Sequence, residues 1–141
     1  MSKLSRLGHI SLYAHDVRRL ASFYEIALEL AVVNLGDETA SLAIDPQSSR
    51  HDLLILGNPH HVHLAFCVDT LNDFKDVWKK LTEHGILAHG PYVEREYASF
   101  SFLDPEGNHV EIIWAHQSEA SDPQRRKISF RELEEFLVSQ E

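Results

Sequence analysis

The stretch HVHLAFCVDT, residues 61–70, decides the fold because it repeats the plan of an earlier stretch, LGHISLYAHD, residues 7–16. Each begins as an alternating, strand-like run that leads to an aspartate, Asp69 or Asp16, and is followed by apolar residues at helical spacing. Three short strand candidates come after each predicted helix, so a βαβββ unit occurs twice, over about residues 7–57 and 61–115. One such unit alone would leave an apolar sheet face bare, and we therefore expect the two units to pair.

Capping signals precede both predicted helices, and a stop signal follows the second. Asp16 is placed to cap the first helix, Thr70 follows Asp69 at the start of the second, and Gly85 stops the second. The expected strands after the helices lie near 31–36, 39–45, 52–57, 86–93, 97–103 and 109–114.

The predicted class is α+β, with two paired βαβββ units forming one half-open, barrel-like sheet module over residues 1–116. Residues 117–141 are expected to add a polar linker and a short C-terminal helix. Ser129 and Glu132 form a capping box, S-x-x-E, for that helix.

Composition limits the function. The 141 residues fit one domain, and 43% apolar residues can build its core. The single cysteine, Cys67, indicates a reducing compartment; no signal peptide or membrane span of roughly 18 apolar residues is seen, so we expect a cytoplasmic protein without membrane association. A net charge of −9 disfavours nucleic-acid partners, and ten histidines direct attention to metal chemistry.

Three residues form the candidate metal site. His9 and His63 stand on the first strands of their units, and Glu111 stands on the last strand of the second. In paired units these strands line the concave side of the sheet, so two imidazoles and a carboxylate would converge there. That donor set favours Fe(II) or Mn(II), although Zn(II) and Ni(II) accept the same ligands. Alternatively, each histidine is a hydrogen-bonded core or rim residue and Glu111 faces water.

These strings, with FLDPEGNHVEI at residues 102–112, resemble the vicinal-oxygen-chelate superfamily of glyoxalases, bleomycin-resistance proteins and extradiol dioxygenases. The resemblance covers residues 7–115. Within it, the segment RHDLLIL at residues 50–56 is similar to one in small extradiol dioxygenases. That similarity implies that His51 is the acid/base beside the metal, and that the substrate is a small molecule with adjacent oxygens, such as a catechol.

The pocket residues depart from the family. Its members usually place a histidine after the Gly-Pro of this region and a tyrosine three residues before the D-P-x-G turn, where this chain has Glu94 and Ser101. We expect Glu94, Tyr97 and Ser101 to border the substrate. The family architecture also implies a homodimer, made through the sheet edges or the terminal helix.

Other activities of the superfamily remain open from the sequence. A fosfomycin-resistance-like thiol transferase uses the same His, His, Glu set, but the stretch after Gly90-Pro91 offers only Arg95 for a phosphonate. A bleomycin-type binding protein would suit the negative charge but has no need of the three ligands. A glyoxalase normally uses a fourth protein ligand, a carboxylate near position 54, where this chain has a leucine.

Overall fold

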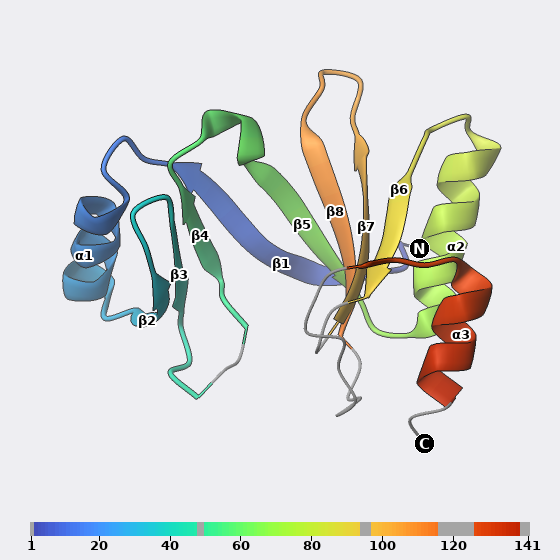
Figure 1. Ribbon diagram of the computed structural model, residues 1–141, viewed down its shortest axis with the longest axis horizontal. Helices are drawn as coiled ribbons and strands as arrows, with labels where there is room; N and C mark the ends of the chain where they lie inside the picture. The colour runs from blue at the N-terminus through green and yellow to red at the C-terminus, as the bar shows by residue number, and fades with distance from the viewer. Residues whose placement is uncertain (1, 48–49, 94–96, 116–125, 139–141) are drawn as a thin grey trace. The chain divides into compact units, whose positions relative to one another are not determined.

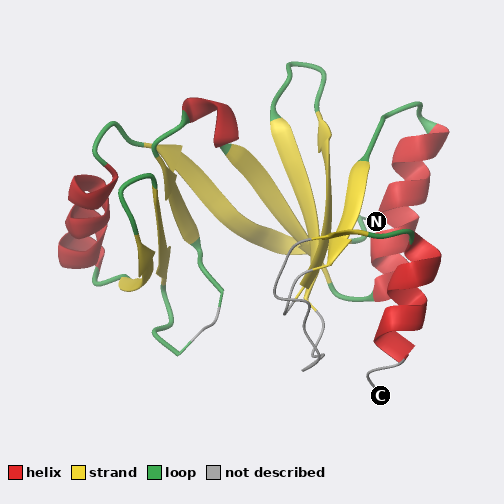
Figure 2. Cartoon of the chain, viewed as in Figure 1, coloured by secondary structure: helices red, strands yellow, loops and turns green. Residues whose placement is uncertain are grey.

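The succession of a strand, a helix and three strands occurs twice along the chain, and a short helix follows it (Figure 2). This is seen in a computed structural model, which describes residues 2–47, 50–93, 97–115 and 126–138. The predicted α+β class, with its duplicated βαβββ plan and C-terminal helix, is confirmed.

The residues divide into two compact units. The N-terminal unit comprises Gly8–Leu64, and the C-terminal unit comprises Ala65–Glu141 together with Met1–Leu7. Strands β1 (Leu4–Tyr13) and β5 (His63–Val68) each contribute residues to both units.

In the N-terminal unit, four strands lie in the order β2-β3-β4-β1 (Figure 1). β1 runs parallel to β4, with Leu12 opposite Ile55, whereas the other neighbours are antiparallel. A parallel neighbour requires a crossover, and here α1, β2 and β3 supply it. Besides β1, the elements are α1 (Val17–Leu28), β2 (Ala31–Leu35), β3 (Thr39–Ala43), β4 (Leu53–Leu56) and a 3-10 turn, η1 (Pro59–His61).

Helix α1 begins where the sequence predicts. The Asp16 carboxylate accepts a hydrogen bond from the backbone N–H of Arg19 at 3.1 Å, which satisfies one of the free donors of the first turn. The apolar face of α1 packs on the sheet and forms the core of this unit. The core residues are Ala14, Val17, Ala21, Ala40, Leu42, Leu53 and Ile55.

In the C-terminal unit, the strands lie in the order β5-β8-β7-β6-β9. Beside β5, the elements are α2 (Leu71–Glu83), β6 (His89–Val93), β7 (Tyr97–Leu103), β8 (His109–Ala115), β9 (Arg126–Lys127) and α3 (Phe130–Val138). β9 lies within the segment predicted as a polar linker and pairs with β6. Its two residues carry no strand-like alternation, so the neighbouring strand, rather than the local sequence, determines their pairing.

Helix α2 also follows its signals. The Thr70 hydroxyl accepts a hydrogen bond from the backbone N–H of Asp73 at 3.0 Å, and Gly85 takes a left-handed φ of +72° after the last turn. Phe74 of this helix is fully buried, and its ring meets the Phe100 ring of β7 edge to face, with centroids 4.8 Å apart. Around them lie Val68, Val93, Ala98, Ile112, Ile128 and Leu133.

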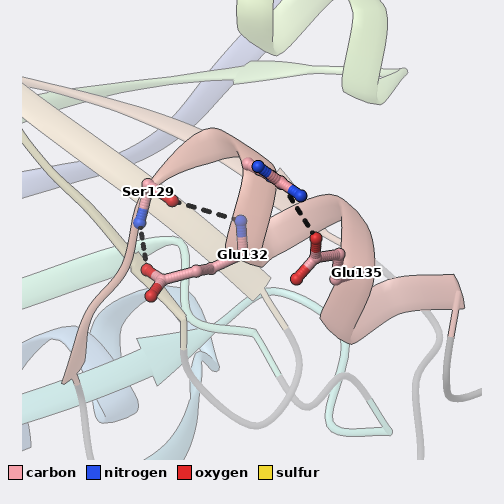
Figure 3. A network of polar contacts seen from close by, with 4 residues as sticks. Ser129, Glu132 and Glu135 are labelled. Carbon is pink, nitrogen blue, oxygen red and sulfur yellow. Dashed lines mark hydrogen bonds and ion pairs between the residues drawn. The ribbon is translucent and has the colours of Figure 1, made fainter.

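The capping box predicted for α3 is present (Figure 3). The Ser129 hydroxyl accepts a hydrogen bond from the Glu132 N–H at 3.2 Å, and the Glu132 carboxylate accepts one from the Ser129 N–H at 2.7 Å. The Phe130 ring packs against Trp78 of α2, with centroids 4.7 Å apart, and Leu133 is fully buried. α3 is therefore part of the core of the C-terminal unit.

The D-P-x-G turn between β7 and β8 depends on the side chain of Asp104. Its carboxylate accepts hydrogen bonds from the backbone N–H groups of Glu106 and Asn108 and from the Asn108 side-chain amide, all at 2.8–2.9 Å. The Asn108 amide and these backbone N–H groups lower the pKa of Asp104. The turn fixes the register that follows, in which Leu103 faces His109.

Cys67 of β5 is buried, and burial raises the pKa of its thiol. No helix in the described part of the chain is both long and apolar enough to cross a membrane.

Candidate metal centre

Two predicted metal ligands come together in the N-terminal unit. The Nε2 atoms of His9 on β1 and His63 at the start of β5 are 2.6 Å apart, and the two rings meet edge to face. His9 is only 8% exposed. The Nδ1 atom of His63 lies 3.0 Å from the carbonyl oxygen of His61. With Nδ1–H donating to that carbonyl, the Nε2 atom of His63 presents its lone pair toward His9.

His51 joins this pair. Its ring centroid lies 4.6 Å from that of His9, and its Nε2 atom is buried and has no hydrogen-bond partner in the described residues. A buried polar atom without a partner is unusual and indicates a missing ligand or a functional role. The three side chains at 9, 51 and 63 are named the histidine cluster below.

Hydrogen bonds from the backbone and side chain of Asp52 fix the chain next to His51, a role that the sequence did not indicate. The Asp52 N–H donates a hydrogen bond to the carbonyl oxygen of Leu42, and the Asp52 carbonyl oxygen accepts one from the Ile10 N–H. The Asp52 carboxylate accepts a third from the Ile44 N–H at 2.8 Å. The residue thereby links β1 and β3 just before β4 begins. In the sequence, the position of Asp52 directly after His51 in the R-H-D string is the feature that could have indicated this role.

The surroundings of His9 and His51 favour their neutral forms by lowering the pKa of each ring. Burial, followed by the neighbouring charges of His51 and His63, lowers the pKa of His9 to about 3. Burial is also the largest cause that lowers the pKa of His51. A neutral imidazole is the form that binds a metal, because its nitrogen lone pair is free.

The third predicted ligand stands in the C-terminal unit. Glu111 lies on β8 directly opposite Ser101 on β7, and residues opposite each other in a ladder share a face of the sheet. Tyr97 has the same parity as Ser101 and so lies on that face, while the alternate residues Phe100 and Ile112 face the core. Two predicted pocket residues therefore share a surface with a predicted ligand. Glu94 lies outside the described residues.

The donor set fits a divalent metal. Two Nε2 atoms face each other, and the Nε2 atom of His51 nearby is buried without a partner in the described residues. Imidazole nitrogens with one carboxylate are ligands for Fe, Mn, Zn and Ni. Among the described residues, no three histidine, cysteine or acidic side chains already stand in metal-binding geometry. The assignment of His9, His63 and Glu111 as one ligand set thus stays a prediction.

A further buried polar side chain lies on β1 near His9. Ser11 follows His9 by two residues on β1 and so shares its face of the strand. Its hydroxyl is buried and has no hydrogen-bond partner within the described residues. In the sequence, two signals mark it: the strand parity that it shares with His9, and the resemblance to fosfomycin-resistance thiol transferases, which place a hydroxyl residue at this position.

The chain is similar to several known proteins. The sequence profile of the Glyoxalase/Bleomycin resistance protein/Dioxygenase superfamily matches residues 6–112. A biphenyl-2,3-diol 1,2-dioxygenase from Rhodococcus globerulus is 25% identical over 123 residues, which are 79% of this chain and 64% of that protein. The chain therefore spans less than two thirds of that relative.

Solved structures show the same fold. A catechol 2,3-dioxygenase superposes with a TM-score of 0.66 at 20% identity, covering 84% of this chain and 42% of its own. The homoprotocatechuate 2,3-dioxygenase of Brevibacterium fuscum, in a complex with 3,4-dihydroxyphenylacetate, gives a TM-score of 0.66 at 21% identity, covering 81% of this chain and 37% of its own. Both are more than twice as long as the matched part, so the likeness concerns the fold.

Proposed function

Because the chain belongs to the glyoxalase/bleomycin resistance protein/dioxygenase superfamily, we propose that it is a metal-dependent, extradiol-dioxygenase-like oxidoreductase. Its substrate would be a small molecule with two adjacent oxygens, such as a catechol. The relative and the solved structures named above carry dioxygenase names, and they favour this activity over the other activities of the superfamily.

The observation that carries the proposal is the histidine cluster. The His9 and His63 Nε2 atoms approach to 2.6 Å, and the buried Nε2 atom of His51, which has no hydrogen-bond partner among the described residues, belongs to a ring beside His9. A purely structural role would not leave the buried Nε2 atom of His51 without a hydrogen-bond partner among the described residues, because buried polar atoms normally find one.

Each residue has a distinct part. His9, His63 and Glu111 would donate lone pairs to the metal, for which we favour Fe(II) or Mn(II). The bound metal would supply Lewis acidity and a template that aligns both substrate oxygens. His51 would accept the substrate hydroxyl proton at its Nε2 atom. Ser101 and Tyr97, which share a sheet face with Glu111, would border the substrate with Glu94.

The test begins with metal content. We expect protein purified without oxygen or an affinity tag to contain close to one equivalent of iron or manganese by mass spectrometry. The His63→Ala variant should lose it. His61→Ala is the matched control, because it removes a nearby exposed imidazole yet keeps the carbonyl that orients His63.

The second step is oxygen uptake with catechol, 2,3-dihydroxybiphenyl and 3,4-dihydroxyphenylacetate. Ring cleavage should consume one O₂ per substrate, and His51→Gln should retain metal while losing at least 100-fold in kcat, the usual order for a proton-transfer group. Protein that binds neither Fe(II) nor Mn(II) would contradict the proposal. Metal binding without oxygen uptake, but with thiol addition to an epoxide, would assign the chain to the thiol transferases instead.

A further inference from the structure

A cavity lies in the C-terminal unit, between α2 and the sheet. Its volume is about 560 Å³, within the range of roughly 300–1,000 Å³ that small-molecule pockets occupy. Its walls are apolar, with Phe66 of β5, Phe102 of β7 and Val77 and Leu81 of α2 among them. We name this space the α2 cavity.

The α2 cavity is on the opposite face of β8 from the proposed metal ligand. Val110 and Ile112 line it, and Glu111 stands between them. Successive side chains of a strand point to opposite faces, so the Glu111 carboxylate points away from this cavity. The two sites are therefore distinct.

The rim of the α2 cavity is unusually basic for this protein. The chain has five lysines and a net charge of −9, yet three of the lysines, at positions 3, 79 and 80, line this one cavity. Two acidic residues are also present: Asp76 lies 3.9 Å from Lys3 as an ion pair, and Glu83 ends α2. Lys79 and Lys80 are exposed and form no ion pair with any described residue.

An apolar cavity with ammonium groups at its mouth fits a ligand of matching polarity. The geometry points to a binding site for a medium-chain alkyl carboxylate, whose chain lies against Phe66 and Phe102 and whose carboxylate meets Lys79 and Lys80. The aliphatic and phenyl walls offer the alkyl chain area but no hydrogen-bonding partner, so burial of the chain provides most of the affinity. The lysines select the anionic head group.

The experiment measures the Kd of decanoate by isothermal titration calorimetry, well below its micelle concentration. Decanol and decyltrimethylammonium are uncharged and cationic probes of similar length. We expect decanoate to bind most tightly, and the Lys79→Glu/Lys80→Glu variant to bind it about tenfold more weakly, as expected for two exposed ion pairs. Arg18→Glu/Arg19→Glu on α1 is the matched control, because it changes net charge equally in the other unit, and it should leave the Kd unchanged.

A second variant locates the site. Val77→Phe adds bulk inside the α2 cavity and should abolish decanoate binding while the metal content stays at the wild-type value. Equal affinity for decanol, an unchanged Kd in the lysine variant, or preference for 1-naphthoate over decanoate would overturn the assignment. Since the Kd of decanoate is measured without added metal or oxygen uptake, failure of decanoate binding is distinguishable from failure of the proposed function.

Discussion

Among single residues, Gly90 is the one whose backbone most restricts substitution. Its φ is +122°, and a Cβ added there would lie 3.1 Å from a ring carbon of Tyr92 and 3.2 Å from the carbonyl oxygen of Ser99. Gly85 also has a positive φ, of +72°, but a Cβ there would meet nothing within 4 Å. Substitution of Gly85 therefore costs only the left-handed backbone conformation, whereas at Gly90 a contact is added to a less accessible conformation.

We predict that Gly85→Ala lowers the free energy of unfolding by about 1 kcal/mol, the cost of a left-handed alanine. Gly90→Ala should lower it by about 3 kcal/mol, because its φ is accessible almost only to glycine and the added methyl group also meets backbone. Urea denaturation of both variants checks this. Equal losses of unfolding free energy in the two variants would contradict this ranking.

Asp104 gives a prediction about pH. Its pKa is lowered, so the turn bonds contribute stability above the unfolded pKa, near 3.8, and lose it as pH falls through the lower folded value. Asp104→Asn cannot titrate. We expect the wild type to be more stable than the variant at pH 7, with the difference shrinking below about pH 4 as the carboxylate is protonated. Urea midpoints at pH 7, 5 and 3 measure it, and a constant difference would contradict the role of the charge.

At the level of elements, helix starts were the most predictable features. Asp16, Thr70 and Ser129 were each identified from the sequence as start signals, and each accepts the expected backbone hydrogen bond. Such caps are local, since donor and acceptor lie three residues apart. Strand β9 was not predictable, because its pairing with β6 depends on residues more than 30 positions away.

The C-terminal helix provides the prediction at this scale. Ser129→Ala removes one half of the capping box and should cost about 1 kcal/mol. Glu132→Gln is the control, because a glutamine oxygen can still accept from the Ser129 N–H. Hydrogen exchange should accelerate first at the α3 amides in Ser129→Ala. Equal exchange in both variants would indicate that packing of Phe130 and Leu133, rather than the cap, holds α3 in place.

For the whole molecule, the site was only partly predictable. The sequence identified the histidines at positions 9, 51 and 63 as a group, and they are close together. It could not show that Asp52 links β1 and β3 beside them, because those hydrogen bonds join segments far apart in the chain. The relation of Glu111 to the cluster also depends on non-local packing, and it stays a prediction.

Metal binding should stabilise the folded chain if the proposed ligand set is correct. A ligand at 100 times its Kd adds about 2.7 kcal/mol when it binds only the folded state. We therefore expect calorimetry to show a higher Tm with Mn(II) than with a chelator in the wild type. His63→Ala should show the same Tm in both solutions. A Tm shift that persists in His63→Ala would place the metal elsewhere.

Alkylation of the buried Cys67 thiol can report when the C-terminal unit opens. Only the thiolate attacks alkylating reagents, and burial both hides this sulfur and disfavours its ionised form. Since the chain has one cysteine, each molecule can gain at most one alkyl group, and only when β5 opens. The rate of that mass increase under native conditions thus counts opening events of the C-terminal unit, without a spectroscopic label and in the presence of any substrate.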